Sequence, residues 1–397
     1  MSLDYKKTIY ACFTGYIVQA VVNNFVPLLF LMFQNSYGIP LQKITLLVTF
    51  NFGLQLVIDL CSIGFVDRIG YRASMIIAHA AAASGLILLT VLPERFSDPF
   101  IGLLLAVIIY AAGGGLLEVL VSPVAEACPT DNKESAMSLL HSFYCWGHVG
   151  VVLLSTLFFA TAGMRNWKLL ALLWAAVPIC NACVFTKVPI APLVEEGGRG
   201  LSVKELFSMK IFWVLMLMMV CAGASEQGVS QWASALAEQG LGVSKTVGDL
   251  AGPMTFAVCM GAARAFYGKK GESIHLETFM MGSSMVCVAA YLAIALMPVP
   301  ALGLAGCGLC GLSVGIMWPG TFSMAAGSVR RGGTALFALL ALAGDVGCSA
   351  GPTLVGMLSG NRGDDLRAGI LIGTAFPILM IVSQALKRMI IKNKEGS

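Results

Sequence analysis

Charge is scarce in this 397-residue sequence, because Asp, Glu, Lys and Arg together make up only 12% of it. Soluble domains carry about 25% charged residues. So few charges could not cover a chain that is 57% hydrophobic, with a mean hydropathy of +0.83. The composition therefore excludes a soluble enzyme, and its apolar content excludes a disordered chain. The small net charge of +4 excludes nucleic acid as a partner.

Catalytic and metal-binding motifs are also missing. The sequence has no Walker loop for ATP, and its Ser, His and Asp residues do not stand in a hydrolase arrangement. The 12 cysteines lie mostly in apolar runs, and the pairs Cys180/Cys183 and Cys307/Cys310 have no nearby His or further Cys. We interpret them as packing residues, and we expect no metal, no cofactor and no enzymatic activity.

Long apolar runs are the main feature that is present. A bilayer-spanning helix needs about 20 such residues. Twelve runs qualify, over residues 8–33, 41–66, 73–92, 99–127, 134–162, 167–187, 209–237, 244–267, 274–297, 300–327, 333–359 and 366–390. They predict an all-α polytopic membrane protein with an N-terminal six-helix bundle (1–188), a linker (189–207) and a C-terminal six-helix bundle (208–397).

The short loops predict the orientation, because Lys and Arg collect on the cytoplasmic side. Most of the 25 Lys and Arg residues fall on the side that holds both termini and the linker. We therefore expect both termini to be cytoplasmic, in the inner (plasma) membrane of the cell.

The two halves also look alike. Pro123 and Pro319 lie in the fourth and tenth runs, and His148 and Asp345 each precede Val-Gly in the next run, at nearly the same separation. This predicts a duplication, with bundles related by pseudo-two-fold symmetry. Chance similarity between glycine-rich helices is the alternative.

A charged loop separates the second run from the third, with the sequence Gly64-Phe-Val-Asp67-Arg68-Ile-Gly-Tyr-Arg72. Its glycines allow a tight turn, Asp67 suits a helix N-terminus, and the two arginines can bond carboxylates. Such a cluster could latch two helix bundles and release them, as a gate. The alternative is an ordinary cytoplasmic turn.

Acidic side chains within the runs need a reason, because a charge at bilayer depth costs at least about 2.5–3.5 kcal/mol. Glu118, Glu226 and Asp345 are the candidates for proton coupling, since a carboxyl group in apolar surroundings can bind and release a proton. Asp59 and Asp249 also lie in spans. The alternative in each case is a carboxylate that a neighbouring helix satisfies.

A polar face in the seventh run suits a solute with hydroxyl groups. Gln227 and Gln231 are four residues apart and share a helical stripe, with Glu226 on the adjacent stripe and Trp232 beside them. Amides and a carboxylate next to an aromatic ring favour a polyol. Hydrogen bonding between helices is the alternative reading.

The loop around Asp67 resembles the signature loop of the major facilitator superfamily, and the loop Gly261–Lys270, with Arg264, is a degenerate counterpart in the second half. The resemblance implies twelve spans, of which the first, fourth, seventh and tenth line a cavity. It also implies that the loop's arginine pairs with an acid at the end of the fourth span, where Glu126 stands.

Further motifs resemble the fucose/glucose:proton symporter branch of that family. They are Asn23-Asn24, Gly114-Gly-Leu-Leu-Glu118, the segment from His141 to Tyr144, Gly223-Ala-Ser-Glu226 with Trp232, and Ile316-Met-Trp318-Pro319. The resemblance implies that Glu118 couples a proton. It also makes Asn23, Asn24, His141, Tyr144 and Trp318 candidates for solute binding, with Glu118 and the polar face of the seventh run. The acid that follows the two asparagines in the fucose symporter is missing here, where Pro27 stands.

These patterns predict a monomeric secondary-active transporter that works by alternating access in the lipid bilayer. The expected reaction is symport of a small polar solute, such as a sugar, with a proton; sodium is the other possible ion. A proton-coupled exporter of drugs or metabolites is the alternative, and a non-transporting receptor built on the same fold is a third reading.

Overall fold

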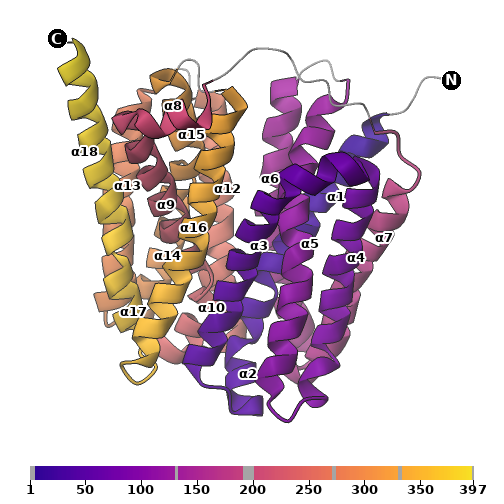
Figure 1. The fold of residues 1–397 in the computed structure, drawn as a ribbon. Coiled ribbons are helices and arrows are strands. Elements are labelled where there is room, and N and C mark those ends of the chain that lie inside the picture. The colour runs from indigo at the N-terminus through magenta and orange to yellow at the C-terminus, as the bar shows by residue number, and fades with distance from the viewer. Residues whose placement is uncertain (1–4, 130–132, 191–200, 271–273, 330–332, 396–397) are drawn as a thin grey trace. The chain divides into compact units, whose positions relative to one another are not determined.

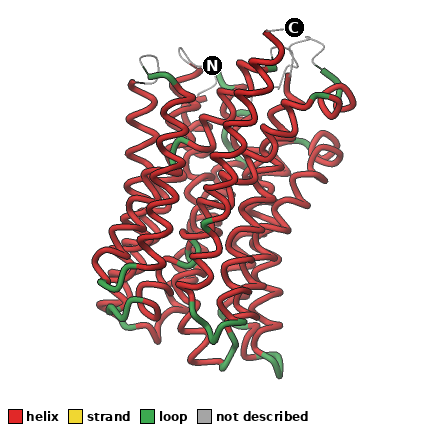
Figure 2. Tube along the Cα trace, turned by 90° about the vertical axis from the view of Figure 1, so that its left-hand side faces the viewer, coloured by secondary structure: helices red, strands yellow, loops and turns green. Residues whose placement is uncertain are grey.

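The structure is a computed structural model that describes residues 5–129, 133–190, 201–270, 274–329 and 333–395. Within its helices, some side chains are not described, namely those of residues 62–65, 67, 68, 126, 133–139, 268–270, 326, 333–335, 337 and 392–395. All regular structure in the described ranges is helical, joined by short loops (Figure 2). The predicted all-α fold is therefore confirmed. The chain divides into two compact units, Met1–Glu195 and Glu196–Ser397.

The N-terminal unit holds the first six predicted spans, drawn from indigo to magenta in Figure 1. Its main helices are α1 (Tyr5–Asn24), α2 (Phe30–Tyr37), α3 (Leu41–Ile69), α4 (Tyr71–Leu89), α5 (Pro99–Ala127), α6 (Lys133–Ala162) and α7 (Trp167–Phe185). The first span bends between α1 and α2, where the short 3-10 helix Val26–Leu29 carries Pro27. Helix α5 packs against α1, α3 and α4 and so occupies the middle of this unit.

The C-terminal unit holds the other six predicted spans. Its helices are α8 (Val203–Ser208), α9 (Lys210–Ser230), α10 (Ala233–Ala235), α11 (Lys245–Asp249), α12 (Thr255–Lys270), α13 (Leu276–Leu296), α14 (Pro300–Val314), α15 (Met317–Ser328), α16 (Gly333–Gly360), α17 (Leu366–Gly373) and α18 (Ala375–Glu395). The π-helical turns Leu236–Gly240 and Leu250–Met254 follow α10 and α11. Helix α9 packs mainly against α16 and α18.

Eleven helical stretches of the described residues are long and apolar enough to cross a membrane. The run over 244–267 is also helical, but it is divided into α11, a π-helical turn and α12, and it contains Lys245, Asp249 and Arg264. These charges lower its hydropathy. The chain is thus a multi-pass membrane protein with the twelve predicted helical segments in order.

Glycines bring α9 and α16 into backbone contact. A Cβ atom added to Gly347 would lie 2.1 Å from the carbonyl oxygen of Val220, and one added to Gly223 would lie 2.2 Å from that of Gly344. Small residues of this kind let membrane helices approach closely. The seventh and eleventh spans therefore form one tightly packed pair within the C-terminal unit.

We expect Gly347→Ala to destabilise the protein by about 1–3 kcal/mol, because the added methyl group overpacks the contact with α9. The matched control is Gly150→Ala in α6, where no atom lies within 4 Å of the added Cβ. Alanine is the better helix former, so the control should be neutral or stabilising. Unfolding of the two purified variants measures the difference, and equal stability of both would contradict the prediction.

Candidate functional site

Asn23 is the centre of a polar network inside the N-terminal unit. Its side-chain oxygen accepts hydrogen bonds from Asn51 Nδ2 at 3.1 Å and from Gln55 Nε2 at 2.8 Å, both on α3. Its amide nitrogen donates to the hydroxyl of Tyr144 on α6 at 3.5 Å. Asn23 itself is buried. The network joins three helices and contains two of the predicted solute-binding residues, Asn23 and Tyr144.

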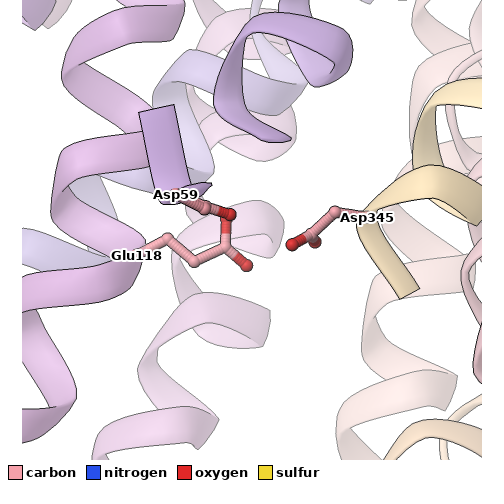
Figure 3. A group of neighbouring side chains, drawn as sticks. All are labelled: Asp59, Glu118 and Asp345. Carbon is pink, nitrogen blue, oxygen red and sulfur yellow. The ribbon is translucent and has the colours of Figure 1, made fainter. Parts of the chain in front are cut away.

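Glu118 lies on α5 in contact with two other helices. Gln19 Nε2 of α1 donates to Glu118 Oε2 at 2.8 Å. Carboxylate oxygens of Glu118 and of Asp59 on α3 lie within 4.8 Å of each other. Figure 3 draws both side chains, with their carboxyl groups side by side. No lysine or arginine forms an ion pair with Glu118 within the described part of the chain. The two acids therefore form one close pair, which we call the acid pair.

His141 joins the same region from α6. Tyr16 on α1 bonds both the hydroxyl of Ser122 on α5, at 2.8 Å, and His141 Nδ1, at 3.3 Å. Ser122 lies one turn from Glu118, so this chain of hydrogen bonds runs next to the acid pair. His141 is exposed, whereas His148 is buried.

The sequence reasoning did not name five residues of this region as site residues, namely Tyr16, Gln19, Asn51, Gln55 and Ser122. The sequence does contain a pattern that could have identified Asn51 and Gln55. With Asp59 they recur every four residues and form a polar stripe on α3. The contact of Gln19 could not be predicted from the sequence, because a single amide does not show which neighbouring helix it faces.

Asn24 takes no part in the network of its neighbour. Its amide Nδ2 donates to the carbonyl of Ala20 in its own helix at 3.0 Å. The structure therefore separates the two asparagines, and the solute-binding role of Asn24 stays a prediction without a supporting contact.

Glu226 has an ion-pair partner in the C-terminal unit that the sequence reasoning left aside. Arg264 Nη2, from α12, lies 3.4 Å from Glu226 Oε2. The second carboxylate oxygen of Glu226 accepts from Gln227 Nε2 at 3.2 Å. Gln231 Nε2 in turn donates to Gln227 Oε1 at 3.0 Å. The predicted stripe of Gln227 and Gln231 is thus a hydrogen-bonded pair, and with Glu226 and Arg264 it forms the polar cluster of this unit.

The aromatic candidates are packed among helices. Trp232 is fully buried, and its indole N–H donates to the carbonyl of Pro352 at 2.9 Å. The half-buried ring of Trp318 lies against Gly344, where an added Cβ would come within 2.1 Å of it. Asp345 follows Gly344 on α16 and is buried. Trp232 shows no exposed ring surface for stacking, and the roles predicted for Trp318 and Asp345 stay predictions.

Most of the predicted gate lies outside the residues whose side chains are described, namely Gly64, Asp67, Arg68 and Glu126. Arg72 is described. Its guanidinium donates to the carbonyls of Phe185 at 2.7 Å and Val188 at 2.8 Å. These bonds tie the start of α4 to the end of α7 inside the N-terminal unit, so they are not bonds to a carboxylate. The gating role stays a prediction.

A second charged cluster lies where α10 and α11 meet. Lys245 Nζ bonds Asp249 Oδ1 at 2.7 Å and Ser234 Oγ at 2.8 Å, and it lies 3.3 Å from Glu238 Oε1. The side chain of Asp249 is 0% exposed, and it also accepts a short hydrogen bond from Ser234. The contacts of Asp249 are therefore those of a buried structural ion pair.

Comparison with known proteins gives a family match. The model of the Major Facilitator Superfamily matches residues 11–352. No curated protein matches the chain.

Several solved structures share the fold at low sequence identity. A bacterial homologue of the human lysosomal transporter Spinster, inward-facing and occupied, is 16% identical with a TM-score of 0.72, over 98% of this chain and 97% of that one. The fucose:proton symporter FucP of E. coli is 16% identical with a TM-score of 0.65, over 96% and 99%. The human organic anion transporter MFSD10 is 15% identical with a TM-score of 0.66, over 96% and 100%. At these identities the likeness concerns the fold alone.

Proposed function

This chain belongs to the Major Facilitator Superfamily of membrane transporters, and we propose that it couples the movement of a proton to symport of a small polar solute such as a sugar. The observation that carries this proposal is the acid pair, in which carboxylate oxygens of Asp59 and Glu118 lie within 4.8 Å of each other inside spans of the N-terminal unit. Two such groups repel each other strongly when both are ionised. A proton on either one removes that repulsion, so the pair is suited to bind one proton.

Gln19 can form a hydrogen bond with Glu118 both before and after Glu118 binds that proton. Its amide Nε2 donates to Glu118 Oε2, a hydrogen bond that stabilises the charged form of the carboxyl group. Its own side-chain oxygen is buried without a hydrogen-bond partner among the described residues. A protonated Glu118 could donate to that oxygen after a rotation of the amide, because glutamine offers both donors and an acceptor. The same residue can therefore hold Glu118 in either protonation state.

Each unit, taken by itself, has polar side chains that suit a hydroxyl-bearing solute. Amides and a phenol around Asn23 and Tyr144 offer donors and acceptors in the N-terminal unit, and Gln227 and Gln231 do so in the C-terminal unit. We assign Glu226 to solute binding in preference to proton binding, because Arg264 already neutralises it. Proton coupling by Glu226 or Asp345 is the alternative prediction. The proposed transporter is a monomer in the inner membrane, with both termini and the linker 189–207 cytoplasmic.

Proton coupling can be measured directly in proteoliposomes. Addition of the transported sugar should make the outside medium more alkaline, because each solute entering takes a proton with it. Glu118→Gln should abolish this alkalinisation while solute counterflow continues, since the amide keeps hydrogen-bonding groups for a solute but does not bind and release a proton near neutral pH. Glu118→Asp, which keeps the carboxyl group, is the matched control. Sugar uptake without any pH change in the wild type would defeat the proposal, and acidification would favour the exporter.

A further inference from the structure

The tenth predicted span is broken in the C-terminal unit. Helix α14 ends at Val314 and α15 begins at Met317, with a turn at Gly315 and Ile316 between them. Proline has no N–H, so Pro319 cannot donate to the carbonyl four residues earlier, which is that of Gly315. Pro123 in the fourth span has a different effect, because α5 runs through it without a break. The tenth span therefore contains a backbone carbonyl that needs a donor from elsewhere.

Arg264 supplies that donor. Its Nε lies 3.4 Å from the carbonyl oxygen of Gly315. The approach is possible because position 315 has no side chain: an added Cβ would lie 2.8 Å from the Cβ of Ala263 and 2.9 Å from the carbonyl oxygen of Met260. Arginine at this point of α12 thus replaces the hydrogen bond that the proline removes.

The same guanidinium also carries the ion pair with Glu226 of α9, through Nη2. One side chain therefore connects three spans: its own, the seventh, and the break in the tenth. Both contacts are 3.4 Å long. Because the guanidinium is a rigid planar fork, a shift of one nitrogen displaces the others. Whatever binds to Glu226 or moves it will therefore alter the bond to Gly315.

We propose that Arg264 is a positioning residue that links the occupancy of Glu226 to the break in the tenth span. The inference rests on the proposed binding of solute at Glu226. When a solute hydroxyl donates to the carboxylate, it competes with Arg264 for the same oxygens. The guanidinium then loosens from Glu226 and from Gly315, and the break becomes free to bend. Solute binding on α9 is thereby converted into a change of shape in α14 and α15.

Hydrogen–deuterium exchange of the full-length protein in nanodiscs tests the link without any solute. The reporters are the amides on either side of the break, in peptides that cover residues 311–320, where Gly315 N donates to Gly311 O and Gly320 N to Ile316 O. Arg264→Gln should raise exchange there about tenfold, because a hydrogen bond to a charged group is lost. Glu226→Gln should raise it by a similar factor, since Arg264 then loses the partner that holds it.

Two further variants keep the test decisive. Arg264→Lys keeps the charge for Glu226 but lacks the fork, so it should fold and still raise exchange at the break, even if Arg264→Gln does not fold. Arg367→Gln is the matched control, because Arg367 likewise donates to backbone carbonyls, those of Ala295 and Met297, elsewhere in the same unit. It should leave residues 311–320 unchanged.

The outcomes separate this inference from the proposed function. If the Arg264 variants that fold show unchanged exchange at residues 311–320, the link is overturned. It is also overturned if exchange there rises in the Arg264 variants but not in Glu226→Gln. D-Glucose and L-fucose serve as the solute probes. If either one drives alkalinisation in proteoliposomes, it should also raise exchange at 311–320 in the wild type, and no change would overturn the link. If neither does, symport of these sugars has failed, while the variants still decide whether Arg264 connects Glu226 to the break.

Discussion

Replacement of Lys245 by methionine should destabilise the C-terminal unit by about 3–5 kcal/mol, the usual cost of removing one partner from a buried ion pair. The cost is high because Asp249 is 0% exposed and would lose the ammonium group that now lies 2.7 Å away. Ser234 would remain as a hydrogen-bond donor, but a hydroxyl group supplies no opposite charge. Glu238, at 3.3 Å from Lys245, would add a second negative charge to the same place.

Thermal unfolding of the purified variant, with expression level as a second readout, measures this effect. Lys43→Met is the matched control, because its pair with Asp98 is largely exposed, at 44% and 41% of the side chains. The hydrogen bond from Lys43, with that from the backbone N–H of Phe100, holds the pKa of Asp98 below its ordinary value. Water screens such a pair, so little stability should be lost.

The double variant Lys245→Met, Asp249→Asn identifies the cause. It removes both charges of the buried pair and should recover much of the stability lost by Lys245→Met alone. If the double variant is as unstable as the single one, the loss comes from packing of the lysine stem and the prediction is wrong.

Hydropathy was sufficient to predict the helices, because each unpaired backbone group in a bilayer costs several kcal/mol and forces the apolar runs into helices. The runs over 99–127 and 134–162 became α5 (Pro99–Ala127) and α6 (Lys133–Ala162). Departures occur where local chemistry interrupts a helix. Pro27 turns the first span through a 3-10 segment, and the π-helical turn that contains Pro253 divides the eighth.

The partners of the charged groups could not be predicted in the same way. Periodicity tells which residues share a stripe, and the pair Gln227–Gln231 follows from it. It does not tell which neighbouring helix that stripe faces, because this depends on how whole helices pack. Arg264 was for this reason assigned to the loop Gly261–Lys270 by its sequence position, whereas packing brings it to Glu226 on another helix. Contacts between spans can therefore be identified only once the arrangement of the helices is known.

Asp59→Asn should abolish uphill transport, although Asp59 belongs to none of the motifs that indicated a symporter. Its carboxylate oxygen lies within 4.8 Å of one of Glu118, and two unit charges at that separation repel by about 3.5 kcal/mol at an effective dielectric of about 20. This repulsion makes it favourable for the acid pair to take up a proton. The asparagine variant removes this repulsion between the two carboxylates. Glu118 can then remain ionised beside Gln19 while the solute crosses the membrane without a proton.

The expected size of the effect follows from the driving force. A membrane potential of about 100 mV is worth about 2.3 kcal/mol for each proton carried, which supports roughly fiftyfold accumulation of a solute that enters with one proton. In Asp59→Asn, accumulation should fall to about onefold at the same potential, while counterflow, which needs no proton, continues. Radiolabelled uptake into energised proteoliposomes measures both. Asp59→Glu, which keeps the second carboxyl group, should retain accumulation; full accumulation by Asp59→Asn would mean that Glu118 binds its proton without help from Asp59.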